Sequence, residues 1–202
     1  LGDEAYKLLK AAGLGGSIDP DSRKLIFKDE EKKISFVYVK PSDVVTYVQN
    51  GVADLGVAGK DVILESDNDV YEILDLGFGK CRFAVAGVKG EKIYKKDEIL
   101  RVATKYPRIS KKYFDERGQK IRLIKLNGSV ELAPLVGLSD VIVDLVETGK
   151  TLKANGLEVI EDMFEVSAKL ICNRVSYRFK FDRINDLIKC LEEMEVQYCE
   201  DN

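Results

Sequence analysis

The sequence has 202 residues, enough for one large domain or two small lobes, and its 45% hydrophobic content is ordinary for a globular protein. A net charge of −3 argues against a nucleic-acid or membrane protein, and no run approaches the ~20 apolar residues of a membrane span. There is no histidine, which excludes His-based zinc sites and Ser-His or Cys-His nucleophilic catalysis. Any chemistry must therefore rest on carboxylates, lysines, arginines, hydroxyl groups and backbone dipoles.

Strands and helices alternate along the sequence. Helical periodicity predicts helices over residues 3–12, 109–117 and 181–196, a helix capped by Ser42 that ends at residue 50, and helix starts at residues 59–61 and at Ser129. Apolar runs predict strands over residues 24–27, 34–39, 54–58, 70–76, 81–88, 100–104, 121–126, 141–146, 157–160 and 168–172. This alternation is typical of an α/β architecture. A charged connection at residues 90–98 separates two βα series, so we expect lobe I to comprise residues 1–80 and 170–202 and lobe II residues 81–169.

The four cysteines are scattered through the sequence without the spacing of a metal site: Cys81, Cys172, Cys190 and Cys199. This pattern indicates reduced, mostly packed thiols, so we expect a cytoplasmic protein.

Residues 141–152 carry the strongest functional signal. An apolar strand that contains Asp144 ends at Glu147-Thr148-Gly149-Lys150-Thr151-Leu152, and a helix is expected to follow. Backbone N–H groups at a Gly-containing turn and helix start can hold a phosphate, and carboxylates just before it can take sugar hydroxyls or magnesium. The alternative is an ordinary strand-to-helix turn in which Thr148 only caps the helix.

Two further loops follow apolar strands and open helices, one at Ala58-Gly59-Lys60-Asp61 and one at Leu126-Asn127-Gly128-Ser129. Ligands of open α/β sheets bind beyond the carboxyl ends of strands, so three such loops around one cleft would suit a polyphosphate. Most loops of this kind are structural, and the pattern alone favours that interpretation for these two. Lys105, Lys40 and Arg23 can likewise be phosphate contacts or solvated surface charges, and Glu131 a ligand or a helix-capping group.

Together, these runs resemble the short form of the ATP phosphoribosyltransferase family over nearly the whole sequence. The matching runs are residues 19–25, 41–44, 46–48, 51–56, 101–107, 126–134, 141–152, 173–174 and 176–177. The resemblance implies two α/β lobes similar to a type II periplasmic binding protein, with the active site in the cleft. It also implies a reaction in which N1 of ATP attacks C1′ of phosphoribosyl pyrophosphate, pyrophosphate leaves and Mg²⁺ is required.

The resemblance further implies roles for individual residues. Thr148, Gly149, Lys150, Thr151 and Leu152 would hold the 5′-phosphate, and Asp144 and Glu147 would contact the ribose. On the ATP or pyrophosphate side, the implied residues are Arg23, Lys40, Asp54, Lys60, Lys105, Asn127, Gly128 and Ser129. Glu147, Asp144 and Arg23 are the expected catalytic residues, and the metal ligands are left open.

Members of this family usually begin with a strand and a Lys-Gly-Arg loop that borders the site, whereas this sequence opens at Leu1-Gly2-Asp3. If that segment is absent, we expect a missing strand and a missing basic contact. The sequence also ends without the histidine-binding domain of the long form. The resemblance therefore implies a regulatory subunit similar to histidyl-tRNA synthetase, joined with catalytic dimers in a hetero-octamer. A compatible hypothesis is that the chain is inactive without this partner. The competing hypothesis is a two-lobed solute-binding module without catalysis.

Overall fold

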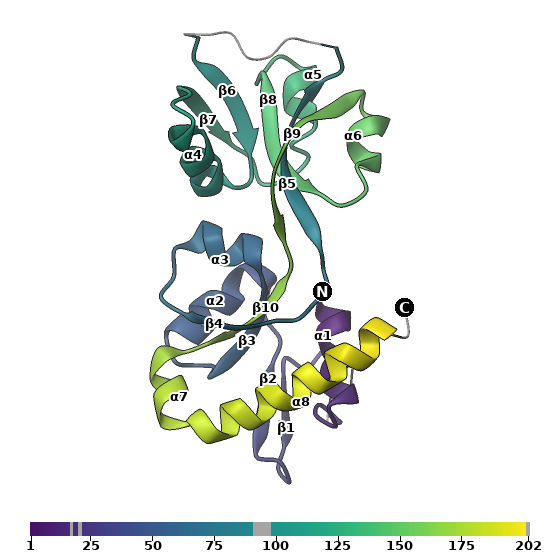
Figure 1. Cartoon of the computed structure of the whole chain (residues 1–202), viewed down its shortest axis with the longest axis vertical. Coiled ribbons are helices and arrows are strands. Elements are labelled where there is room, and N and C mark those ends of the chain that lie inside the picture. Colours follow the sequence, from purple (N-terminus) through teal and green to yellow (C-terminus); the bar gives the residue numbers. More distant parts are fainter. Residues whose placement is uncertain (17, 20–21, 91–97, 201–202) are drawn as a thin grey trace. The chain divides into compact units, whose positions relative to one another are not determined.

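The computed structural model describes residues 1–16, 18–19, 22–90 and 98–200, which form two compact α/β units (Figure 1). Unit 1 comprises Leu1–Gly79 and Ser167–Asn202, and unit 2 comprises Lys80–Val166. The boundaries expected from the sequence, after residues 80 and 169, lie one and three residues further along the chain. Most of the expected charged connection at residues 90–98, and residues 20–21 of the first matching run, lie outside the described residues.

Unit 2 is built on a five-stranded sheet of order β7-β6-β8-β5-β9. Its strands are β5 (Cys81–Val88), β6 (Leu100–Thr104), β7 (Ile121–Lys125), β8 (Val141–Val146) and β9 (Leu157–Val166). β6 pairs in parallel with β7 and β8, whereas β5 runs antiparallel to β8 and β9. β9 extends to Val166, beyond the predicted end at residue 160, because its acid-rich second half pairs with β5 at the edge of the sheet.

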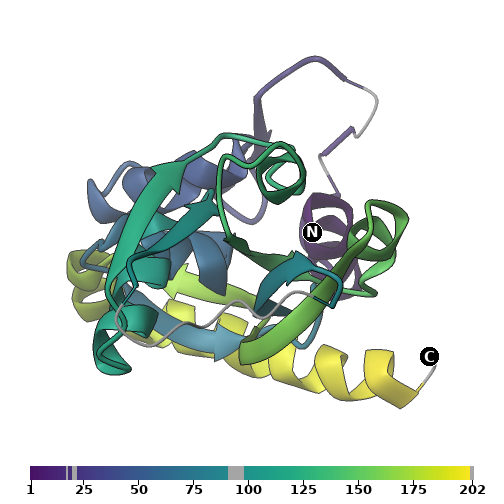
Figure 2. The same ribbon diagram turned by 90° about the horizontal axis from the view of Figure 1, so that it is seen from above.

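Helices cover both faces of this sheet. Figure 2 shows α4 (Pro107–Glu116) on one side and α5 (Leu132–Leu135) and α6 (Lys150–Ala154) on the other. The α5 and α6 side packs through an apolar cluster whose buried members are Ala84, Ala86, Ala103, Val130, Ala133, Ile142, Val146, Leu152 and Leu157. The predicted helix after Ser129 is thus the single turn α5, whose buried Ala133 packs in this cluster, whereas its Leu132 and Leu135 are exposed.

Unit 1 is built on a three-stranded antiparallel sheet of order β3-β10-β4. Its strands are β3 (Leu55–Gly59), β10 (Ala168–Cys172) and β4 (Tyr71–Asp75). One cluster joins β3 and β10 to α2 (Pro41–Gln49) and α3 (Lys60–Ser66) through Val45, Val48, Ala58, Ile63 and Ile171. A second cluster joins the sheet to α1 (Gly2–Ala11) and α8 (Phe181–Glu200) through Leu8, Leu76, Ala168, Leu170 and Leu191.

Two features of unit 1 differ from the sequence prediction. α2 begins at Pro41 with Lys40 as its N-cap, because proline suits the first helical position; the Ser42 hydroxyl instead donates to Asp43 Oδ1 over 3.0 Å. The short helix α7 (Arg174–Phe179) was not predicted, and it begins where the Asn173 side chain accepts hydrogen bonds from Val175 N and Ser176 N.

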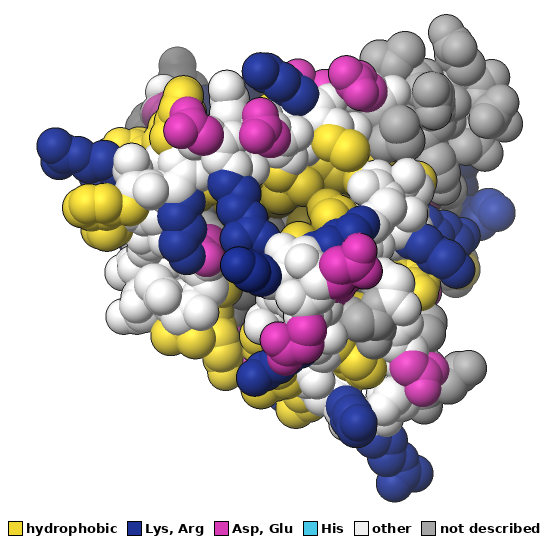
Figure 3. Space-filling view, turned by 90° about the horizontal axis from the view of Figure 1, so that it is seen from below, with side chains coloured by type: hydrophobic (Ala, Val, Ile, Leu, Met, Phe, Trp, Pro, Cys, Tyr) yellow, Lys and Arg dark blue, Asp and Glu magenta, His cyan; other side chains and the backbone are white. Residues whose placement is uncertain are grey.

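The remaining elements of unit 1 are the hairpin of β1 (Ile26–Asp29) and β2 (Ile34–Val37). On the face of the molecule in Figure 3, lysine and arginine side chains surround exposed hydrophobic ones. None of the described helices combines the length and apolar composition needed to cross a membrane.

Candidate functional site

The carboxyl ends of three neighbouring strands define the candidate site in unit 2. β7, β6 and β8 run parallel in that order, so the residues that follow them emerge at the same end of the sheet, beyond the carboxyl ends of these strands. Lys105 follows β6, Asn127 to Ser129 follow β7, and Glu147 to Thr151 follow β8. Ligands of open α/β sheets bind beyond the carboxyl ends of the strands. Two of the three predicted loops and Lys105 are thus brought together, whereas the loop at Gly59 and Lys60 belongs to unit 1.

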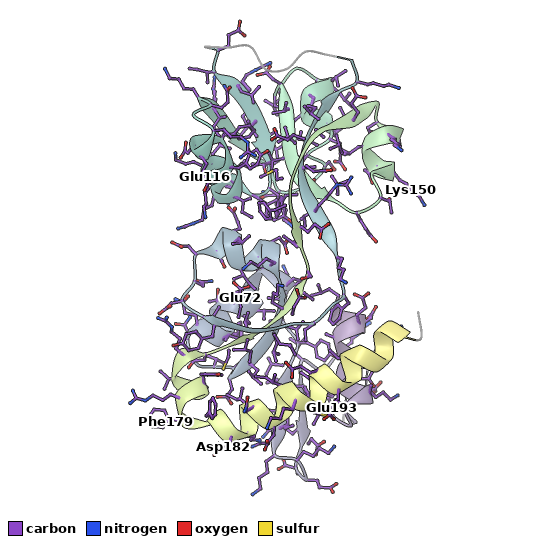
Figure 4. All side chains as sticks on the ribbon, viewed as in Figure 1. Glu72, Glu116, Lys150, Phe179, Asp182 and Glu193 are labelled. Atoms are coloured by element: carbon purple, nitrogen blue, oxygen red, sulfur yellow. The ribbon has the colours of Figure 1, made fainter. Side chains whose placement is uncertain are left out.

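The loop after β8 turns sharply into α6. Gly149 is the N-cap of α6 and has a φ of 70°, a conformation that glycine adopts without a Cβ clash. Thr148 is therefore not the cap, although its hydroxyl accepts from Lys150 N over 3.4 Å. Glu147, Thr148, Lys150 and Thr151 are exposed, and Lys150 points outward from α6 (Figure 4). The first N–H groups of a helix lack intrahelical partners, so this turn can receive an anion.

Leu152, predicted as a binding residue, lies in the interior. Its side chain is 6% exposed and packs in the apolar cluster beneath α6. A helix of five residues has little stability of its own, so this contact fixes the loop to the sheet. Leu152 can therefore act on a ligand through its backbone and by holding the loop in place.

Asp144 is a half-buried carboxylate on the core side of β8. Alternation along the strand places it on the face of Ile142 and Val146, both buried in the apolar cluster. Burial raises the pKa of Asp144 and the nearby Glu131 raises it further, while a hydrogen bond from Leu145 N and the charge of Lys105 act in the opposite direction. Leu145 N donates to Asp144 Oδ1 over 2.8 Å. An ionisable group held in an apolar setting beside other charges is a typical feature of functional sites.

Lys105 and Glu131 flank this carboxylate from the neighbouring strand and from α5. Thr104 lies opposite Val143 in the β6–β8 register, so the next residues along the two parallel strands are Lys105 and Asp144. Glu131 occupies the N-cap position of α5 but makes no side-chain capping bond. Its capping role is therefore not supported, and its influence on Asp144 was not visible in the sequence.

The loop after β7 contains a strained residue. Ser129 has a φ of 48°, which is uncommon for a residue other than glycine. Strained backbone of this kind tends to occur where ligands bind. Asn127, Gly128 and Ser129 are all exposed.

The remaining predicted residues lie in unit 1. Arg23 and Lys40 are exposed, and Lys60 Nζ lies 2.5 Å from Glu72 Oε1. Asp54 accepts from Ser176 Oγ over 2.6 Å and from Lys180 Nζ over 2.7 Å. Burial would raise the pKa of Asp54, but the hydrogen bonds from Lys180 and Ser176 outweigh it and lower that pKa. Asp54 therefore connects the start of β3 to the segment around α7, a role that its sequence context did not reveal.

Among the described residues, no three or more Asp, Glu, Cys or His side chains converge as a metal cage would require. Mg²⁺ usually keeps several waters and takes one or two carboxylates together with substrate phosphates. Asp144 and the nearby Glu131, whose charge raises the pKa of Asp144, are two carboxylates of the kind that this mode of binding uses.

Comparisons with known proteins give one consistent family. The family model for ATP phosphoribosyltransferase matches residues 40–193. A Clostridioides difficile protein named ATP phosphoribosyltransferase is 69% identical over 192 residues, covering 95% of this chain and 92% of the relative. One from Brachyspira hyodysenteriae is 55% identical over 198 residues, covering 96% and 95%.

Solved structures agree as well. The Thermotoga maritima ATP phosphoribosyl transferase (HisG:HisZ) complex matches with a TM-score of 0.83 and 35% identity, covering 96% of this chain and 94% of that one. A substrate-binding protein of an amino acid ABC transporter matches with a TM-score of 0.61 at 15% identity, covering 98% and 80%, which confirms the expected fold class. The chain belongs to the ATP phosphoribosyltransferase family.

Proposed function

We propose that the chain catalyses its family's reaction, transferring the 5-phosphoribosyl group of phosphoribosyl pyrophosphate to N1 of ATP in the first step of histidine biosynthesis. The assignment to particular residues rests on one observation in unit 2. At the carboxyl end of β8, a turn at Gly149 that can receive an anion follows the half-buried Asp144. The turn and the start of α6 bind the 5′-phosphate. Asp144 and Glu147 bind the ribose.

The proposed chemistry is compatible with a sequence that lacks histidine. Adenine N1 carries a free lone pair, so its attack on C1′ needs no general base. The C1′–O bond to pyrophosphate breaks as the C1′–N1 bond forms, and the ring gains positive charge that the carboxylates of Asp144 and Glu147 stabilise. Lys105 offsets negative charge on the departing pyrophosphate. Alignment of two bound substrates contributes on the order of 7–11 kcal/mol in well-oriented cases.

Magnesium is the proposed cofactor. The carboxylates of Asp144 and Glu131 would hold the ion together with substrate oxygens. When bound, Mg²⁺ would neutralise charge on the pyrophosphate group.

The roles assigned to residues of unit 1 stay a prediction. Arg23, Lys40, Asp54 and Lys60 are assigned to the ATP or pyrophosphate side; of these, Asp54 already contacts Lys180 and Lys60 already contacts Glu72. The match to the HisG:HisZ complex supports a regulatory partner for this chain. We further propose a subunit similar to histidyl-tRNA synthetase, catalytic dimers, a hetero-octamer and a cytoplasmic location.

The decisive assay combines the chain, its regulatory partner, ATP, phosphoribosyl pyrophosphate and Mg²⁺, and follows phosphoribosyl-ATP by its ultraviolet absorbance. Glu147→Gln should lower kcat, because it removes a charge near C1′. Glu116→Gln, which removes an exposed charge at the end of α4, is the matched control and should leave kcat unchanged. Product formation at the wild-type rate by Glu147→Gln would remove the proposed role of Glu147.

The fold match to a solute-binding protein favours one second candidate, a binding module without catalysis. Calorimetry separates the two functions. Binding of both ATP and phosphoribosyl pyrophosphate supports the transferase. Binding of an amino acid alone, with no product in the coupled assay, would support the module.

A further inference from the structure

Thr104 lies beside two of the three site segments, those that follow β6 and β7, and next to Val143 of β8. It is the last residue of β6, which lies between β7 and β8, and its side chain is fully buried. The Thr104 hydroxyl donates to Val143 O over 2.7 Å and accepts from Tyr106 N over 2.9 Å. The Thr104 carbonyl oxygen accepts from Leu126 N over 3.0 Å.

Each of these partners is the immediate neighbour of a candidate site residue. Tyr106 follows Lys105, Leu126 precedes Asn127, and Val143 precedes Asp144. One residue therefore holds the chain where it leaves β6 and β7, and it also holds β8 at Val143, in each case within one peptide unit of a predicted substrate contact.

The hydroxyl performs a task that the regular sheet pattern does not. Because Tyr106 N bonds to a side chain on its own strand, the chain leaves the β6 ladder directly after Thr104 and turns toward α4. The same hydroxyl holds β8 at Val143, just before Asp144. A hydroxyl can donate and accept at once, so one side chain links the Lys105 turn to the strand that carries Asp144.

We propose that Thr104 is a positioning residue for phosphoribosyl pyrophosphate, whose hydroxyl sets the relative placement of Lys105 and Asp144. The inference rests on the proposed function and names a residue that touches no substrate. Its effect is carried by position, because a displacement of about 1 Å in a catalytic group can cost roughly 10²-fold in rate.

The test is Thr104→Val, which keeps nearly the same side-chain shape and removes the hydroxyl. In the complex with the regulatory subunit, kcat/KM for phosphoribosyl pyrophosphate should fall by about 10²-fold. Calorimetry should show weaker binding of phosphoribosyl pyrophosphate and unchanged binding of ATP. Thr104→Ser keeps the hydroxyl and should retain most of the wild-type values.

The matched control is Ser110→Ala. Ser110 is also fully buried and donates to Tyr106 O over 2.8 Å, but that bond lies within the α4 segment. Ser110→Ala should lower the Tm while leaving both substrate affinities unchanged. If Thr104→Val behaves like Ser110→Ala, the positioning role is wrong.

The Thr104→Ser variant decides the question even if Thr104→Val does not fold. Folded Thr104→Ser with wild-type affinity for phosphoribosyl pyrophosphate supports the proposal, because only the methyl group has been lost. Folded Thr104→Ser with a large loss of affinity would assign the effect to methyl packing and overturn it. Failure of the proposed function is a separate outcome, since the wild-type complex would then form no phosphoribosyl-ATP.

Discussion

Leu152→Ala should disorder the segment Glu147 to Leu152, the proposed phosphate loop, while unit 2 stays folded. Leu152 is 6% exposed and anchors a helix of only five residues. The truncation removes three carbon atoms, which costs roughly 2.4 kcal/mol in transfer free energy at about 0.8 kcal/mol per CH₂. The cavity that remains brings the usual cost of Leu→Ala to about 2–5 kcal/mol. Typical domains are stable by about 5–15 kcal/mol, so we expect the sheet to persist.

Most of this loss should fall on α6, because a helix of this length is not stable without its packing. Once the ordered loop is a minor state, the apparent Kd rises in inverse proportion to its population. Once the ordered loop is the minor state, each further loss of about 1.4 kcal/mol in its stability weakens binding tenfold. We therefore expect the Kd for phosphoribosyl pyrophosphate, measured by calorimetry, to rise by about tenfold or more, with the Kd for ATP unchanged.

Leu157→Ala is the matched control. Leu157 is 2% exposed in the same apolar cluster, but the β9 ladder holds it opposite Val88. The two variants should lose similar amounts of thermal stability, and only Leu152→Ala should lose affinity for phosphoribosyl pyrophosphate. Equal affinities in the two variants would refute the argument that Leu152 packing orders the phosphate loop.

Three further predictions concern the same loop and strand. Thr148→Ala and Thr151→Ala should each raise KM for phosphoribosyl pyrophosphate, and unchanged values in both would remove the phosphate-loop assignment. Gly149→Ala places a Cβ 3.8 Å from Val146 Cγ1, an ordinary contact distance, but the alanine must keep a φ of 70°. Urea unfolding should therefore show a loss of about 1–2 kcal/mol in the free energy of unfolding. Gly16→Ala, at an open site without a positive φ, should show no such loss. Asp144→Asn should unfold at higher urea than wild type at neutral pH. Because the pKa of Asp144 is raised in the folded state, its ionisation lowers stability as pH rises through that pKa, and the two proteins should converge at low pH.

Local pattern was sufficient to place most strands and the turn after β8, whereas the phosphate-binding role of that turn stays a prediction. The apolar run of β8 and the glycine after Thr148 are neighbours in sequence, so their spacing alone places a turn at the end of a strand. The strand predicted from the sequence ends at residue 160, because the acidic residues that follow are typical of a surface loop. In the structure Glu161, Asp162 and Glu165 pair with β5. A strand defined by hydrogen bonds to a distant partner can carry a composition that hides it.

Long-range contacts explain most of what the sequence did not show. The bond from Ser176 Oγ to Asp54 joins residues 122 positions apart, and Thr104 Oγ1 reaches Val143 across 39 positions. Neither pair has a local signature. The positive φ of Ser129 was equally hidden, because serine gives no indication of left-handed backbone as glycine does.

Thr104 is the last residue of β6, and Asp144 lies within the adjacent strand β8, one residue after Val143, to which Thr104 bonds. The two polar side chains differ in how fully their hydrogen-bonding capacity is used, which suits them to different tasks. The Thr104 hydroxyl is engaged both as donor and as acceptor, so it adds rigidity. The Asp144 carboxylate can accept at about four positions, of which Leu145 N occupies one, and burial and Glu131 both oppose its charge. In the proposed complex, a sugar hydroxyl or a cation that reaches Asp144 would offset part of that cost and so would favour binding of the ribose end of the substrate. The bond from Thr104 to Val143 would keep β8 in place, so that this favourable free energy is not spent on rearranging the strand.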